Sequence, residues 1–142
     1  MNPQWVLDAA RDFRIASQML GAQFGQTYWP LRSTVMCAAF SAELYLKYLA
    51  VGTTGDLERE HDLRKLYDAL PEGVRILVAT KYQGQRPLLD VLSEHRATFV
   101  EWRYIFEKQS GAFGLDCNSL IALCSALDAA ASVVHAESKR GP

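Results

Sequence analysis

The chain has 142 residues, of which 49% are hydrophobic and 22% charged, and its formal net charge is −1. This length suits one domain, residues 1–142, and the composition excludes extended disorder. A net charge close to zero excludes the strongly basic surface that non-specific nucleic-acid binding requires, although a local basic patch is compatible with it.

The first predicted element is a helix that begins at Asn2 and Pro3. Asparagine is a favoured N-cap residue, and proline is favoured in the first turn, where its missing N–H costs nothing. Apolar side chains then recur at helical spacing as far as Phe24, with most charged residues outside this stripe. We therefore expect an amphipathic helix that ends before a short break at residues 25–28.

The central predicted element is the segment from Trp29 to Gly52, which is apolar on nearly every side. Pro30 suits the first turn and Gly52 the C-terminal cap, so a helix of about 20 residues and about 30 Å is expected between them. A helix of this kind lies in the middle of a bundle rather than on its surface. Glu43 and Lys47 lie within it, four residues apart and in the order that favours an ion pair.

The segments that follow are shorter. A polar loop over residues 53–60 leads to His61 and Asp62, and Asp62 is expected to cap an amphipathic helix over residues 63–70. Residues 71–83 fit a helix or an apolar strand. We favour the helix because no second strand is present to pair with it.

Two long helices complete the pattern. The first is expected to begin at Pro87 and to continue to about Lys108, with its apolar residues at spacings of three and four. A glycine-rich break, residues 110–117, separates it from a final alanine-rich helix that Asn118 is expected to cap. The alternation of helices with short loops predicts an all-α fold, an up-down helical bundle of four long helices plus one or two short helices.

No targeting segment or membrane span is expected. Asp8, Arg11 and Asp12 occupy the region in which a signal peptide needs an apolar run, and Glu43 and Lys47 interrupt the best candidate for a span. The three cysteines show no CxxC or Cys/His ligand spacing, so no metal site and no cofactor are predicted. Unpaired thiols indicate a reducing compartment, and we expect a soluble, cytoplasmic protein.

Three groups of charged residues are candidates for a functional site. They are a pair on the central helix, a pair at the loop-to-helix junction and a group on the late helix: Glu43 and Lys47; His61 and Asp62; Arg96, Arg103 and Glu107. If the late helix packs antiparallel to the central one, Arg103 lies close to Glu43. The alternative interpretation is that Glu43, Arg103 and Glu107 form a structural ion-pair network that only satisfies buried charge.

The order AAFSAELYLKYLAV, a polar loop, HDLRKLYDAL and then FVEWRYIFE resembles the HEPN superfamily of prokaryotic helical domains. The resemblance covers residues 35–107. Its most specific part is an E-L-x-L-K central helix followed by H-D-L-x-x-L. It implies a single helical-bundle domain and a homodimer. It also implies action with a nucleotidyltransferase-type partner protein, or in toxin–antitoxin and phage-defence systems.

Catalytic members of this family are metal-independent ribonucleases, in which an Arg on a late helix is followed after four to six residues by a His. Such a His accepts the 2′-hydroxyl proton, and the Arg stabilises the charge that develops on the phosphate. Arg103 is the best match to that Arg, but residues 108–110 are Lys, Gln and Ser. If the chain is catalytic, His61 has to supply the base from another part of the fold.

The leading hypothesis is a HEPN-like homodimer, divergent or non-catalytic, that binds a nucleotide, an RNA or a partner protein through a cleft around Glu43, Lys47, His61, Arg103 and Glu107. The residues expected to bind are Glu43, Lys47, Asp62, Arg96 and Glu107. The alternative is a metal-independent endoribonuclease toxin with Arg103 and His61 as catalytic residues. A third hypothesis is a purely structural subunit whose charged residues are core salt bridges.

Overall fold

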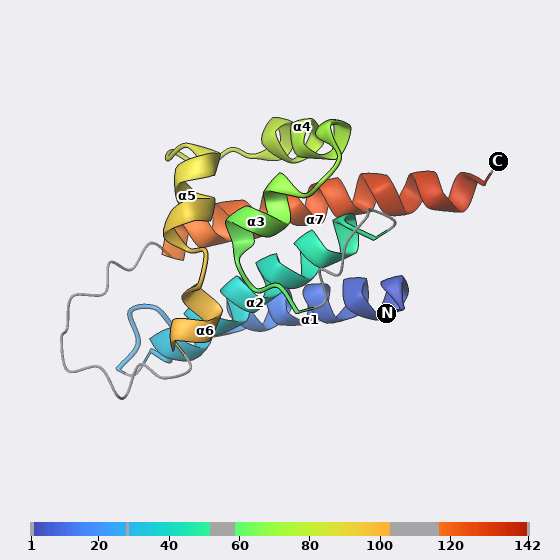
Figure 1. The fold of residues 1–142 in the computed structure, drawn as a ribbon. Helices are drawn as coiled ribbons and strands as arrows, with labels where there is room; N and C mark the ends of the chain where they lie inside the picture. Colours follow the sequence, from blue (N-terminus) through green and yellow to red (C-terminus); the bar gives the residue numbers. More distant parts are fainter. Residues whose placement is uncertain (1, 28, 52–58, 103–116, 142) are drawn as a thin grey trace.

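The computed structural model describes residues 2–27, 29–51, 59–102 and 117–141, and the regular elements in these ranges are all helices (Figure 1). In chain order they are α1 (Pro3–Gly21), α2 (Leu31–Leu49), α3 (Leu63–Asp68), α4 (Glu72–Lys81), α5 (Leu88–Glu94), α6 (Thr98–Trp102) and α7 (Cys117–Arg140). The predicted all-α fold is therefore confirmed.

The longest described helices, α1, α2 and α7, lie side by side, and α2 contacts both of the others (Figure 1). α1 runs antiparallel to α2. α7 runs parallel to α2, so that Tyr45 meets Asp128 and Tyr48 meets His135. The short helices α3 to α6 lie in the connection between α2 and α7, and the arrangement of four long up-down helices is not confirmed by the described residues.

The sequence signals at several helix ends are confirmed. The Asn2 side chain accepts hydrogen bonds from two backbone N–H groups at the start of α1, and Asp62 does the same for α3. α2 follows Pro30 directly and has Ala50 as its C-cap, while Gly52, the predicted cap, lies outside the described residues. α4 shows that the ambiguous segment after α3 contains a helix.

The predicted continuous helix over residues 87–108 is wrong in its described part, because α5 ends in a turn and α6 starts at Thr98. His95 is buried in this turn, and its Nδ1 lies 3.0 Å from the hydroxyl oxygen of Thr98. The carbonyl of Arg96 accepts a hydrogen bond from the N–H of Leu63 at 3.0 Å, so it bonds to a distant segment rather than within a helix. These two contacts stabilise the turn.

The predicted cap of the last helix is also wrong. α7 begins at Cys117, so Asn118 lies inside this helix rather than before it. Among the described helices, α7 is long and apolar enough to cross a membrane by length and composition alone, whereas the best candidate expected from the sequence was the region of α2. Core helices commonly meet this criterion, and α7 packs on α2 and α4.

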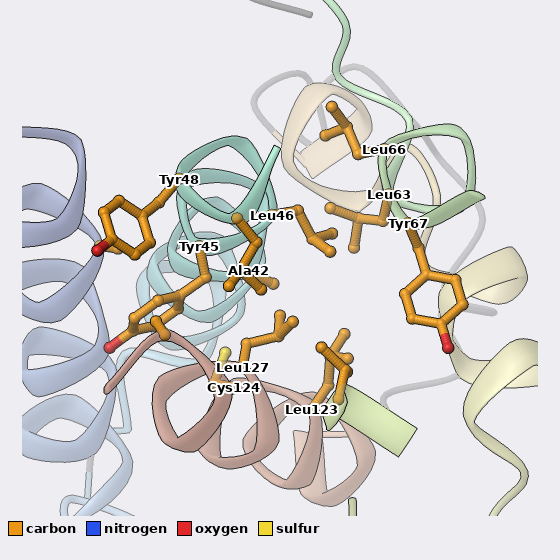
Figure 2. Close-up of a cluster of buried hydrophobic side chains, with 14 of the residues drawn as sticks. Ala42, Tyr45, Leu46, Tyr48, Leu63, Leu66, Tyr67, Leu123, Cys124 and Leu127 are labelled. Atoms are coloured by element: carbon orange, nitrogen blue, oxygen red, sulfur yellow. The ribbon is translucent and has the colours of Figure 1, made fainter. Parts of the chain in front are cut away.

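The core lies where α2 meets α7, and α3 closes a third side (Figure 2). The buried side chains in this region include Ala42, Tyr45, Leu46, Leu63, Leu66, Leu123, Cys124 and Leu127. Full burial of one large apolar side chain contributes about 1.5–3 kcal/mol, so this cluster holds α2 in the centre of the fold. The prediction of a buried central helix is confirmed.

Candidate functional site

The candidate site centres on the carboxylate of Glu43, which α2 places inside the protein. Only 2% of this side chain is exposed, and its Oε2 lies 3.1 Å from Nζ of Lys47, one turn further along the helix. The other oxygen, Oε1, lies 3.1 Å from Nδ1 of His61. The ion pair that the sequence predicts is therefore formed, and a histidine from the loop before α3 completes the group.

Burial explains why these three groups gather. A lone carboxylate removed from water is strongly disfavoured, whereas one with a cation on one oxygen and an N–H donor on the other is tolerated. Lys47 is also buried and supplies the cation. Because an ionised carboxylate can only accept hydrogen bonds, Nδ1 of His61 carries the proton in this contact. Glu43 thus sets both the orientation and the tautomer of the imidazole.

His61 is the exposed member of the group, with 52% of its side chain accessible. Its Nδ1 is occupied by Glu43, so Nε2 is the ring nitrogen available to a ligand. In the neutral ring, Nε2 can accept a proton or a hydrogen bond; in the protonated ring, it donates one to an anion. The geometry therefore suits a base or an anion-binding group.

A second pair fixes the backbone next to His61. Asp62 caps α3 with Oδ1, while its Oδ2 accepts a hydrogen bond from Nε of Arg96 at 2.9 Å. The N–H of Leu63 donates to the carbonyl of Arg96. Glu60 accepts hydrogen bonds from the N–H groups of His61 and Asp62, both at 3.0 Å. This loop is consequently held to the turn between α5 and α6.

The structure brings into one region five of the predicted site residues: Glu43, Lys47, His61, Asp62 and Arg96. Arg103 and Glu107 lie outside the described residues, so the contact of Arg103 with Glu43 stays a prediction. The sequence places His61 and Glu43 around one expected cleft, but their direct contact was not predicted. One signal in the sequence indicated such a contact. Lys47 can pair with only one oxygen of the Glu43 carboxylate on this apolar helix, so the other oxygen needs a second donor.

A polar cluster that was not predicted from the sequence lies on the opposite side of α2, between α1 and α7. Asp128 accepts a hydrogen bond from the hydroxyl of Tyr45 at 2.8 Å and forms ion pairs with Arg14 at 3.3 Å and Arg11 at 3.7 Å. Burial, followed by the hydrogen bond to Asp128, raises the pKa of Tyr45 far above its ordinary value. Every group here is satisfied by a partner, which indicates a structural role in joining three helices.

The described residues contain no group of three or more His, Cys, Asp or Glu side chains that could hold a metal ion. The comparisons add no relative: no family model, no curated protein and no solved structure matches the chain. The functional interpretation therefore rests on the site itself and on the sequence resemblance.

Proposed function

We propose that the protein is a HEPN-like helical homodimer, divergent or non-catalytic, that binds a nucleotide or an RNA through its phosphate groups at His61. The observation that carries this proposal is the half-exposed imidazole of His61, held by the buried carboxylate of Glu43, which Lys47 neutralises. The contact engages Nδ1, so the other ring nitrogen, Nε2, is the one that this half-exposed side chain can offer to a ligand.

The charges around His61 support an anionic ligand. Arg59 and Lys65 are exposed on either side of it in the chain. The nearby carboxylates of Glu60 and Asp62 are occupied by backbone N–H groups, and Asp62 is also paired with a guanidinium. The cations therefore remain more available to a ligand than the carboxylates do, and phosphate is the anion shared by nucleotides and RNA.

Large apolar side chains that are exposed to solvent in the described part of the chain support the homodimer. On α1 and just after it, Trp5, Met19 and Phe24 are exposed, Trp5 to 74%. Exposed aromatic and large apolar side chains are typical of protein interfaces. A nucleotidyltransferase-type partner protein, in a toxin–antitoxin or defence system, belongs to the same proposal and rests on the resemblance alone.

Binding of ATP and of a fluorescent single-stranded RNA, measured by calorimetry and anisotropy, tests the proposal. We expect His61→Ala to weaken binding of the active ligand by about tenfold, as for loss of one charge-assisted hydrogen bond. The matched control is His135→Ala, which removes a histidine on α7 and leaves the site intact. Equal affinities for the two variants, or wild-type protein that binds neither ligand, would refute the proposal.

A second candidate is the metal-independent endoribonuclease that uses His61 with Arg103, and the Glu43–His61 contact is what favours it. Nε2 of His61 would remove the 2′-hydroxyl proton, the 2′-oxygen would attack phosphorus, and the bond from phosphorus to the 5′-oxygen would break. The 5′-oxygen would leave with a proton from water, giving a 2′,3′-cyclic phosphate. Incubation of RNA with the protein in EDTA distinguishes the candidates. Cyclic-phosphate ends that disappear in His61→Ala and Arg103→Ala support cleavage, and intact RNA across the pH range excludes it.

A further inference from the structure

A groove separate from the His61 site lies between α4 and the pair formed by α3 and α5. α4 packs on α7, and α3 packs on α5, which leaves an open space of about 720 Å³ between the two units. Its lining includes Tyr67 of α3, Arg75 and Ile76 of α4, and Leu88 and Leu89 of α5. This volume is in the usual range for sites that take small organic molecules.

The walls of the groove are largely apolar and incompletely covered. Ile76 is 58% exposed and Leu89 is 45% exposed, although both belong to helices packed against the core. Tyr67 does not offer its hydroxyl to a ligand, because that group donates to the carbonyl of Arg75 at 3.1 Å. This hydrogen bond fixes the start of α4 relative to α3, so the groove is formed in advance of any binding.

The polar feature of the groove is Arg75. Its Nε is buried and has no hydrogen-bond partner, and no ion pair of its guanidinium is found among the described residues. An arginine side chain is always charged, and its buried N–H groups normally have acceptors. Arg75 as a whole is partly exposed and lines the groove, so a ligand with an anionic oxygen can approach the guanidinium from this side.

Three carboxylates restrict the size and charge of this ligand. Asp68, Glu72 and Asp90 also line the groove, and all three are exposed. Asp68 is paired with Arg64 at 3.1 Å. Exposed carboxylates are screened by water, yet together they disfavour a polyanion such as RNA, whereas a single anionic group can reach the more buried Arg75.

We propose that this groove is a second binding site, and that its ligand is a small organic monoanion with an apolar body, such as an alkyl or aryl carboxylate. The anionic head accepts hydrogen bonds from Arg75, and the apolar body lies along Ile76 and Leu89. The site does not depend on the function proposed for His61.

Titration of the full chain with decanoate, followed by calorimetry and by amide chemical shifts, tests this site. We expect shifts to concentrate in α4 and α5, and Arg75→Gln to weaken decanoate binding by about tenfold while leaving decanol binding unchanged. Leu89→Trp, a substitution at an exposed position that fills the groove, should abolish binding of both. His61→Ala should bind decanoate as the wild type does.

Four outcomes would overturn the proposal. They are no binding of decanoate by the wild type, shifts centred on the exposed face of α1, equal binding by Arg75→Gln, and tighter binding of decylammonium than of decanoate. Tighter binding of decylammonium would mean that the carboxylates of Asp68, Glu72 and Asp90, rather than Arg75, select the ligand. If Arg75→Gln does not fold, Leu89→Trp and the comparison of decanoate with decylammonium still decide the matter.

Discussion

The Nδ1 atom of His61 lies 3.1 Å from Oε1 of Glu43, although the two residues are 18 positions apart in the chain. One residue is fixed inside α2 and the other is half exposed in the loop before α3. The contact therefore transmits the rigidity of the central helix to a surface side chain. A preorganised imidazole loses less conformational entropy when it binds a ligand or reacts.

The first prediction concerns the buried member of this pair. Glu43→Gln removes the charge that balances Lys47 while keeping the size of the side chain. Breaking a buried ion pair from one side commonly costs about 3–5 kcal/mol, and we expect a loss of unfolding free energy near the lower figure because His61 is half exposed and remains hydrated. Urea denaturation measures it. The control is Glu94→Gln, which breaks an exposed pair with Arg86 and should cost less than about 1 kcal/mol.

A result in which the two glutamine variants unfold at the same urea concentration would contradict this view of the site. It would mean that the Glu43 group contributes no more than a surface ion pair does.

The second prediction concerns Asp62, which links the loop to two other segments. Asp62→Ala removes the cap of α3 and the partner of Arg96, and we expect a loss of about 1–2 kcal/mol. Faster amide exchange should be seen at Leu63, whose N–H bonds to the carbonyl of Arg96. Asp68→Ala is the control, because its carboxylate forms only an exposed pair with Arg64 on the same helix. Unchanged exchange at Leu63 would show that the backbone contact holds the turn without Asp62.

The starts of α1 and α3 could be predicted from the sequence because their signals are local, whereas the cap expected at Asn118 was wrong. Asn2 and Asp62 stand immediately before the N–H groups that they cap, so residue type and position suffice. The interruption between α5 and α6 could not be predicted in this way. The interruption depends on the contact between His95 and Thr98 and on the hydrogen bond between the carbonyl of Arg96 and the N–H of Leu63. The apolar spacing of the sequence continues across the interruption and gives no sign of it. Tertiary contacts override local periodicity there.

The candidate site was only partly predictable for the same reason. The spacing of Glu43 and Lys47 along one helix indicates their pairing directly. The partner of the other carboxylate oxygen comes from a loop, whose path no periodicity describes. The polar cluster around Asp128 was missed because α7 runs parallel to α2, and helix direction within a bundle depends on the connecting segments.

The third prediction uses the thiols. Cys124 is fully buried, burial raises its pKa to about 12, and its Sγ lies 3.1 Å from the carbonyl oxygen of Ala38. Since the thiolate is the reactive form, iodoacetamide should leave Cys124 unmodified in the native protein. Cys37 and Cys117 are partly exposed and should be modified first, Cys37 slowly because burial raises its pKa as well. Mass spectrometry of digested protein gives the order, and in urea all three should react at similar rates. Early modification of native Cys124 would show that α7 separates from α2.

The fourth prediction is a loss of stability at alkaline pH. Burial raises the pKa of Tyr45, and the hydrogen bond to Asp128 raises it further, so the folded state holds this proton more tightly than the unfolded chain does. Burial raises the pKa of Tyr48 and Tyr67 in the same direction. The contribution of such a group is complete below the unfolded pKa of about 10 and is lost as pH rises through and above that value. Urea unfolding at pH values between about 8 and about 11 should therefore show a falling free energy of unfolding in the upper part of the range.

Tyr45→Phe separates the two effects of that hydroxyl. The variant should lose about 1 kcal/mol at neutral pH, because Asp128 loses a hydrogen-bond donor. Its stability should then decline less steeply at alkaline pH, because one of the tyrosines that resist ionisation in the folded state is gone. The two stability curves should converge as pH rises. Parallel curves over the whole range would show that Tyr45 ionises as readily in the folded protein as in the unfolded chain. The polar cluster around Asp128, between α1, α2 and α7, would then be accessible to water.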